Sequence, residues 1–279
     1  MRTARKRMGL TQIAISKNLG ISQGALSKLE SAQLVPSAPQ WFEFCEMTGI
    51  APDCLSRGYI ERNRPAILES DDASLGWFKM PKKYVEFRGS KARATLIFID
   101  YFKATLGEEK FLQYLEMVKI DPDVFVDLDN QMNLAFILDL TRTLIQQGHL
   151  KPKDMPALVK TVTRPQSHGS LHRHYDAVET SIELLTTLIR NSRQYECNFE
   201  YEIEDQKVDR MVISVKPERH LKHTHYKNDP MLGNFLCQYK QSYFERFAYY
   251  NGGKGVTLHE NECHYKGAEK CIYSIKTAA

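Results

Sequence analysis

The sequence predicts an all-α helix-turn-helix domain followed by an α+β domain with an antiparallel sheet. Between residues 11 and 30, apolar residues recur at helical spacing on both sides of a glycine. From residue 197 the spacing changes to two, which is typical of a strand with one buried face. We therefore expect domains over residues 1–64 and 91–279, joined by a linker over 65–90.

The composition is that of a globular protein. The chain has 279 residues, of which 42% are hydrophobic, and no apolar run reaches the roughly 18 residues of a membrane span. No apolar signal-peptide core follows the arginine-rich N-terminus. We therefore expect a cytoplasmic protein with no membrane partner, whose six cysteines are thiols or metal ligands rather than disulfides.

The net charge of +4 is concentrated near the N-terminus. Residues 1–64 contain nine Lys/Arg against five Asp/Glu, whereas the remaining 215 residues contain 29 of each kind. The first acidic residue is Glu30, so an unopposed cationic cluster is expected from Arg2, Arg5, Lys6, Arg7, Lys17 and Lys28. Such a cluster suits a polyanion such as DNA, although a solvated charged face would have the same composition.

Two short helices are expected in residues 11–30. Thr11 can cap a helix over 12–19, Gly20 ends it, and Ser22 can cap a second helix through Glu30. The side chains expected to be buried are Ile13, Ala14, Leu19, Ile21, Ala25, Leu26 and Leu29. Two helices about a glycine-containing turn make a helix-turn-helix.

The stretch RKRMGLTQIAISKNLGISQGALSKLE, residues 5–30, resembles the Cro/repressor-type (XRE) family, and a helix over 41–50 fits the continuation of that family. The resemblance implies that the second helix faces the major groove of double-stranded DNA. The expected DNA-binding residues are Arg5, Gln12, Lys17, Ser22, Gln23, Gly24, Ser27 and Lys28. Gln, Ser and Lys can all bond base edges. The alternative is a protein-interaction module on the same fold.

The second domain is expected to begin with helices and to end with strands. Helices are expected at about 91–106, 109–119, 131–147 and 174–191, and a long aromatic helix at about 232–250. In the first strand Cys197, Phe199, Tyr201 and Ile203 alternate with Glu196, Asn198, Glu200, Glu202 and Glu204, which predicts a dry face and a wet face. A turn at 205–207 would lead to a strand over 211–215, and two more strands are expected near 255–263 and 271–276. In the linker, Trp77-Phe78 is expected to pack onto one of the domains.

Three thiols and a carboxylate near the C-terminus stand in the pattern Cys-x22-Glu-x2-Cys-x7-Cys. They are Cys237, Glu260, Cys263 and Cys271, which are residue types that tetrahedral zinc takes. Taken alone, such cysteines are as often small buried hydrophobes. His259 or His264 could replace Glu260 as a ligand. The histidines at 220, 223 and 225 could hold a second metal, but such groups are more often surface residues.

Residues 258–273 are similar to the end of the 4-vinyl-reductase (4VR) type ligand-binding domain of phenol-sensing activators. The resemblance implies a structural Zn²⁺ on the three cysteines and Glu260. Because the side-chain period of a strand is two, Glu260 and Cys263 would point to opposite faces, so we expect a bulge near Asn261. More weakly, residues 90–216 resemble the arabinose-binding-type sensor region of AraC-like regulators.

These features predict a homodimeric, one-component transcription regulator that is not an enzyme and that binds a small, largely apolar or aromatic ligand. The residues expected to line the ligand pocket are Phe199, Tyr201, Phe235, Tyr239, Tyr243 and Phe247, although a filled core would have the same aromatic stripe. The alternatives are an enzyme with a catalytic zinc, and a DNA-bound scaffold whose second domain only dimerises or recruits a partner.

Overall fold

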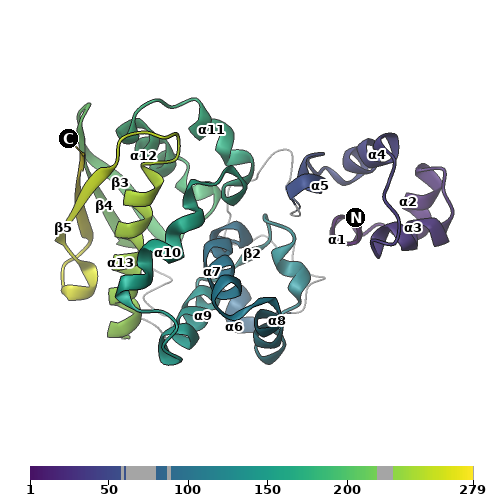
Figure 1. Ribbon diagram of the computed structural model, residues 1–279, viewed down its shortest axis with the longest axis horizontal. Coiled ribbons are helices and arrows are strands. Elements are labelled where there is room, and N and C mark those ends of the chain that lie inside the picture. Colours follow the sequence, from purple (N-terminus) through teal and green to yellow (C-terminus); the bar gives the residue numbers. More distant parts are fainter. Residues whose placement is uncertain (58–59, 61–79, 87–88, 219–228, 279) are drawn as a thin grey trace.

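The computed structural model describes residues 1–57, 60, 80–86, 89–218 and 229–278. A group of short helices at the N-terminus is followed by a larger α+β unit, and the sheet of that unit lies at the end of the molecule remote from the N-terminal helices (Figure 1). The fold class predicted from the sequence is therefore confirmed. Within the described residues, no helix is long and apolar enough to cross a membrane.

The N-terminal domain contains five described helices. They are α1 (Arg2–Arg7), α2 (Gln12–Asn18), α3 (Gln23–Glu30), α4 (Ala38–Thr48) and α5 (Cys54–Arg57). Both expected caps are present, because the Thr11 hydroxyl accepts a hydrogen bond from the backbone N–H of Ala14 and the Ser22 hydroxyl accepts one from that of Ala25. The helix expected over 41–50 begins and ends slightly earlier, as α4.

One side chain expected in the N-terminal core lies on the surface. Ile13 is 65% exposed, whereas Ile15, which was not expected in the core, is fully buried. Successive helical residues are about 100° apart, so Ile15 and Leu19 share a face of α2 and Ile13 points away from it. The core of this domain also contains Leu26 from α3 and Phe44 from α4.

The second domain begins with helices and short strands. They are α6 (Lys82–Val85), β1 (Ser90–Lys91), α7 (Leu96–Leu106), α8 (Glu108–Met117), β2 (Gln131–Met132), α9 (Ala135–Gln146), α10 (Met155–Leu158), α11 (His172–Asp176) and α12 (Ser181–Arg190). The helices expected from 91, 131 and 174 are wrong at their starts. Lys91 pairs with Gln131 between β1 and β2, and α7 begins only at Leu96. The helix α12 begins only after Thr180, whose hydroxyl accepts from the N–H of Glu183.

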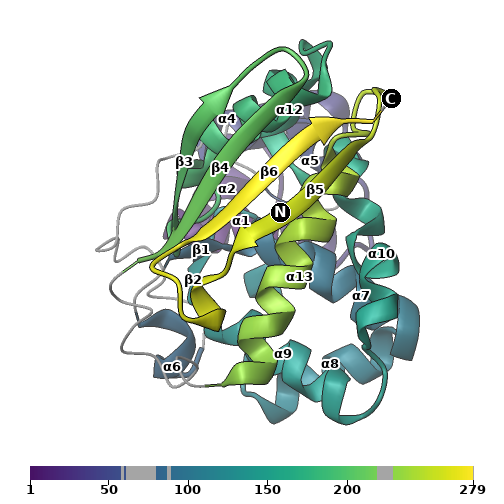
Figure 2. The same ribbon diagram turned by 90° about the vertical axis from the view of Figure 1, so that its left-hand side faces the viewer.

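The long aromatic helix α13 (Pro230–Phe247) and four strands complete the domain. The strands are β3 (Phe199–Gln206), β4 (Arg210–Pro217), β5 (Val256–Glu262) and β6 (Cys271–Thr277), in the antiparallel order β3-β4-β6-β5. They lie side by side with α12 and α13 against one face (Figure 2). The first hairpin turns at 207–209 rather than at 205–207.

The alternation expected along β3 is confirmed from Phe199 onward, because the glutamates between its apolar residues are exposed. It is wrong for Glu196 and Asn198, which precede the strand. The Asn198 side chain is buried and donates to the carbonyl of Gly89 at 3.0 Å and to the Ser90 hydroxyl at 2.6 Å. These contacts turn the chain inward before β3 begins.

Part of the expected linker is folded onto the second domain. Tyr84 of α6 is buried, and its hydroxyl donates to Asp139 of α9 at 2.9 Å. The expected packing of Trp77-Phe78 and the histidines at 220, 223 and 225 lie outside the described residues.

Candidate functional site

The exposed side of α3 carries most of the residues expected to contact DNA. Ser22, Gln23, Gly24, Ser27 and Lys28 are all exposed, and Lys17 of α2 is exposed as well. Polar side chains that project from a short helix can reach base edges and phosphates of a duplex.

The remaining two expected DNA-binding residues are engaged within the domain. The Arg5 guanidinium donates to both carboxylate oxygens of Glu30, at 2.5 and 3.0 Å, and the Gln12 amide donates to the same carboxylate at 2.9 Å. Burial alone would raise the pKa of Glu30, but these hydrogen bonds outweigh it and lower the pKa. Arg5 therefore ties α1 to α3.

Arg7 connects the two domains. Its guanidinium forms a 2.9 Å ion pair with Asp127 of the second domain and donates to the carbonyl of Thr48 at 3.0 Å. Beside it, Ile60 pairs with the backbone on both sides of Asp127. The expectation of an unopposed cationic cluster is therefore wrong for Arg5 and Arg7, because acidic residues distant in the sequence face both of them.

A series of buried hydrogen bonds continues from Asp127 into the second domain. The Asp127 carboxylate accepts from the backbone N–H of Asp129 at 3.1 Å. One oxygen of Asp129 in turn accepts from Lys91 at 3.1 Å and from Arg93 at 3.0 Å. Arg93 also donates to the carbonyl of His168 at 3.0 Å. We call these contacts, from Arg7 to His168, the buried polar chain.

Arg93 and His168 line a cavity of about 100 Å³ inside the second domain. Most of its wall is apolar and comes from α7, α13 and β3, with Ile97, Phe98, Leu236 and Phe199 among the contributors. The buried polar chain therefore runs from the helix-turn-helix domain to the wall of this cavity.

Four of the six residues expected to line a ligand pocket line this cavity: Phe199, Tyr201, Tyr239 and Tyr243. The other two lie elsewhere. Phe247 is fully buried against Tyr175, and Phe235 lines a separate hollow beside Met155. Residues spaced by four drift around a helix of 3.6 residues per turn, so the two ends of the aromatic stripe face different neighbours.

Two further polar residues of the cavity, Glu196 and Lys240, were not expected there. The Glu196 carboxylate accepts hydrogen bonds from the Tyr201 hydroxyl and from the Asn198 amide. Lys240 is only 7% exposed, and its ammonium lies 3.0 Å from the centre of the Phe199 ring. One signal was present in the sequence, since Lys240 is four residues from both Leu236 and Phe244 and so interrupts an apolar stripe.

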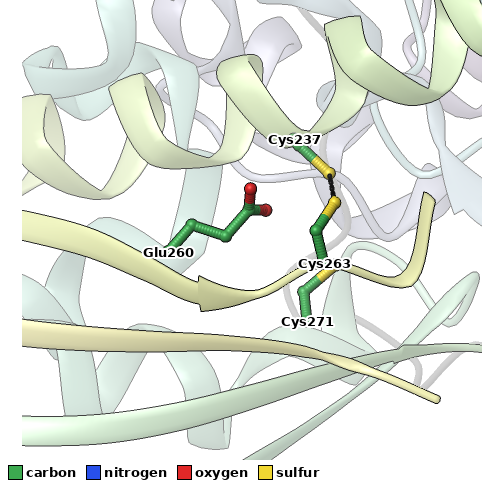
Figure 3. Close-up of side chains that lie close together, drawn as sticks. All are labelled: Cys237, Glu260, Cys263 and Cys271. Carbon is green, nitrogen blue, oxygen red and sulfur yellow. Dashed lines mark hydrogen bonds between the residues drawn. The ribbon is translucent and has the colours of Figure 1, made fainter. Parts of the chain in front are cut away.

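The second candidate site is a group of three thiols and a carboxylate. Ligand atoms of Cys237, Glu260, Cys263 and Cys271 all lie within 4.8 Å of one another, and the sulfurs of Cys237 and Cys263 are 3.3 Å apart. Figure 3 shows Cys237 projecting from α13 toward the other three residues, of which Glu260 lies on β5, Cys263 directly after it and Cys271 on β6. This group could hold a metal ion.

The four side chains meet because of two local irregularities. The register between β5 and β6 shifts between Glu260 and Glu262, which is the bulge expected near Asn261. On the helix side, a Cβ added to Gly233 would lie 2.5 Å from the Tyr265 ring, so only glycine lets the loop after β5 approach α13 this closely.

Two features of the group would suit a bound cation, whereas the raised pKa values of Cys237 and Cys263, caused by neighbouring thiols and by burial, oppose loss of their protons when no cation is bound. One carboxylate oxygen of Glu260 is buried without a hydrogen-bond partner among the described residues, and the other accepts from Lys266 at 3.1 Å. A hydrogen bond from Cys237, with further help from the N–H of His264, lowers the pKa of Cys271.

The two histidines considered as alternative ligands are outside this group. His259 is exposed, and the imidazole of His264 contacts the carbonyls of Ala268 and Glu269. Of the candidates for the fourth position, only Glu260 has a ligand atom within the group.

Comparison with known proteins agrees with the N-terminal assignment. Residues 1–53 match the family model HTH_3, described as Helix-turn-helix. No curated protein sequence matches the chain. The N-terminal domain is therefore a helix-turn-helix DNA-binding domain of the HTH_3 type.

Solved structures are similar to a large part of the chain. An H-NOX protein from S. oneidensis in the Fe(II)NO ligation state is similar with a TM-score of 0.51 and 12% identity, over 68% of this chain and 99% of that chain. The phenol-responsive sensory domain of the transcription activator PoxR with phenol has a TM-score of 0.35 and 13% identity, over 54% and 79%. At such identities the H-NOX likeness concerns the fold alone.

An iron group like that of the H-NOX structure does not fit the cavity of this chain. The histidine that lines the cavity, His168, has its Nε2 against the carbonyl of Val162. Burial lowers the pKa of His168 to about 4. The volume of about 100 Å³ is also well below the roughly 300–1,000 Å³ of pockets for larger ligands.

Proposed function

We propose that this protein is a transcription regulator whose sequence-specific DNA binding is controlled by a small, largely apolar molecule in the cavity of the second domain. The observation that carries the proposal is the buried polar chain, which runs from Arg7 of the DNA-binding domain to Arg93 and His168 in the cavity wall. A ligand that displaces Arg93 would change the hydrogen bonds of Asp129. Because the backbone N–H of Asp129 donates to Asp127, the change would reach the residue that contacts the N-terminal domain.

The charged side chains of the buried polar chain are shielded from water, which makes such coupling efficient. The side chains of Arg7, Asp127, Asp129 and Arg93 are each at most 8% exposed. Water screens buried charges poorly, so a change at one of them is felt by its neighbours. The ligand would then shift the population of domain arrangements that place α3 on DNA.

We further propose that Cys237, Glu260, Cys263 and Cys271 hold one structural Zn²⁺, as the 4VR resemblance implies. Support comes from the convergence of the ligand atoms within 4.8 Å and from the partnerless oxygen of Glu260. Four protein ligands would close a tetrahedral site, whereas a catalytic zinc keeps one position for water. This argues for a stabilising role and against a zinc enzyme.

The protein is also proposed to bind DNA as a twofold dimer. One α3 helix per chain contacts too few base pairs to select a genomic site, and dimers of this kind of domain bind half-sites about one helical turn apart. A footprint of a single undivided half-site, bound by one chain, would contradict the dimer.

Two experiments test the proposal together. Selection of binding sites from random duplexes with the full chain should recover a palindromic sequence, and small molecules can then be scored by their effect on affinity for it. Native mass spectrometry of freshly purified protein reports the metal, the subunit count and any retained small molecule. Failure to select any sequence would contradict the regulator assignment, and a folded protein without metal would contradict the zinc site.

A further inference from the structure

The ammonium group of Lys240 is the unusual feature of the cavity. The side chain is 7% exposed and projects from α13 into the cavity wall, yet among the described residues no oxygen or nitrogen accepts a hydrogen bond from it. Its one described contact is with the face of the Phe199 ring. A ring face attracts a cation but does not replace the acceptors that three N–H donors need.

Glu196, the carboxylate among the residues that line the cavity, already has partners. Glu196 accepts from the Tyr201 hydroxyl and the Asn198 amide, and no ion pair joins it to Lys240. Burial lowers the pKa of Lys240, which Glu196 and the three clustered thiols partly offset. A buried ammonium without an acceptor is costly, so a group that supplied one would be bound strongly.

The other charged side chains that line the cavity do not supply an acceptor to Lys240. Arg93 forms an ion pair of 3.0 Å with Asp129, and Glu196 is engaged by Tyr201 and Asn198. His168 is uncharged at neutral pH, because burial lowers its pKa to about 4. A hydrogen bond from an ammonium to a negatively charged oxygen is stronger than one to a neutral oxygen, so the cavity favours a ligand with an anionic acceptor.

Size and lining restrict the rest of the ligand. The cavity volume is about 100 Å³, and an engineered apolar cavity of about 150 Å³ in another protein holds benzene. The walls contributed by Ile97, Phe98 and Leu236 offer no polar side-chain atom. The uncharged part of the ligand should thus be apolar and smaller than an aromatic ring, as is a short aliphatic chain.

We infer that the cavity selects a small monocarboxylate with an apolar body, whose carboxylate accepts hydrogen bonds from the Lys240 ammonium. This rests on the proposed function, in which the cavity holds the controlling ligand. The carboxylate completes the hydrogen bonding of Lys240, and the body displaces water from the apolar wall. A neutral phenol or alcohol of the same size would offer the Lys240 ammonium only an uncharged acceptor.

The test compares acids with neutral molecules of the same shape. Binding of propanoate and butanoate to the full chain with its metal is measured by calorimetry, beside propanamide, butanamide and phenol. Each acid should bind at least about tenfold more tightly than its amide. Lys240→Met, which keeps the length of the side chain, should abolish the preference, while Lys240→Arg should retain it. Lys110→Gln, an exposed lysine of α8, is the matched control and should change nothing.

Metal content and circular dichroism are recorded on every sample, because Lys240 also lies one turn from Cys237. Equal affinity of acid and amide for the unmodified protein overturns the inference, as does a preference that survives Lys240→Met. If phenol binds and shifts DNA affinity while the acids do not, the ligand class is wrong and the regulator stands. If no probe binds, both the ligand class and the proposed role of the cavity fail.

Discussion

Arg7 of the helix-turn-helix and Asp127 of the second domain form an ion pair of 2.9 Å in which the side chains are 8% and 0% exposed. The two residues are 120 positions apart in the chain. Burial raises the pKa of Asp127, and the Arg7 guanidinium opposes this rise. Because the desolvated pair lies between domains, its loss should affect their coupling more than the fold of either one.

The first prediction concerns this pair. Arg7→Met and Asp127→Asn should each destabilise the full chain by about 3 kcal/mol, because each leaves one buried polar partner unpaired. The double variant should lose less than the sum, with an interaction energy of about 1–3 kcal/mol in urea unfolding. Additive losses would show that the pair contributes no coupling. In either single variant the effect of ligand on DNA affinity should be reduced.

The second prediction concerns acid stability of the N-terminal domain. The pKa of Glu30 is lowered in the folded state, so its ionised form stabilises the domain above its ordinary value of 4.5, and this contribution is lost as the pH falls through the lowered pKa. Glu30→Gln should remove that part of the acid transition, measured by circular dichroism between pH 5 and 2. An unchanged transition would mean that other carboxylates govern it.

The third prediction separates base contacts from phosphate contacts. Gln23→Ala or Ser27→Ala should weaken binding to the selected operator by about 1–3 kcal/mol each, with little effect on random duplex. Lys17→Ala should instead weaken both alike and reduce the dependence on salt. Equal losses on both duplexes for Gln23→Ala would remove it from the base-reading surface. Arg5→Ala is not a suitable probe, because it leaves Glu30 without its ion-pair partner.

The fourth prediction concerns the approach of α13 to the loop that carries Cys263. Gly233→Ala would place a Cβ 2.5 Å from the Tyr265 ring, so the loop must shift and metal retention should fall. Gly24→Ala is the matched control, since its Cβ would have no neighbour closer than 3.9 Å. Adding Tyr265→Ala to the Gly233 variant should restore the metal. Full metal content in Gly233→Ala would show that the loop adapts freely.

The fifth prediction concerns the proposed zinc ligands. Cys263→Ser or Cys271→Ser should remove the metal and unfold or aggregate the second domain, because binding free energy contributes to folding. The helices of the N-terminal domain should persist. Cys197→Ser, at a cysteine outside the group, should leave the metal content unchanged. A metal-free but stable Cys263→Ser protein would assign these cysteines to the core alone.

Several features could be predicted from the sequence because they depend on neighbours along the chain. The caps at Thr11 and Ser22 follow from local side-chain chemistry, and the alternation of β3 from Phe199 follows from strand geometry. The bulge near Asn261 could also be predicted, because it follows from requiring two ligands on one face. In each case the period of the element and the type of residue suffice.

Only the tertiary structure decided which charges have partners. Arg5 and Arg7 are both part of a basic run in the sequence, yet Glu30 and Asp127 neutralise them from 25 and 120 residues away. In the sequence Lys240 does not differ from other lysines in helices, and only the fold places it against the ring of Phe199 of β3 and in the wall of the cavity. Local sequence determines how an element forms and which face is apolar. The environment of a charge depends on elements brought together from distant parts of the chain. For this reason the buried polar chain, and the positions of Glu196 and Lys240 in the cavity, could not be predicted from the sequence.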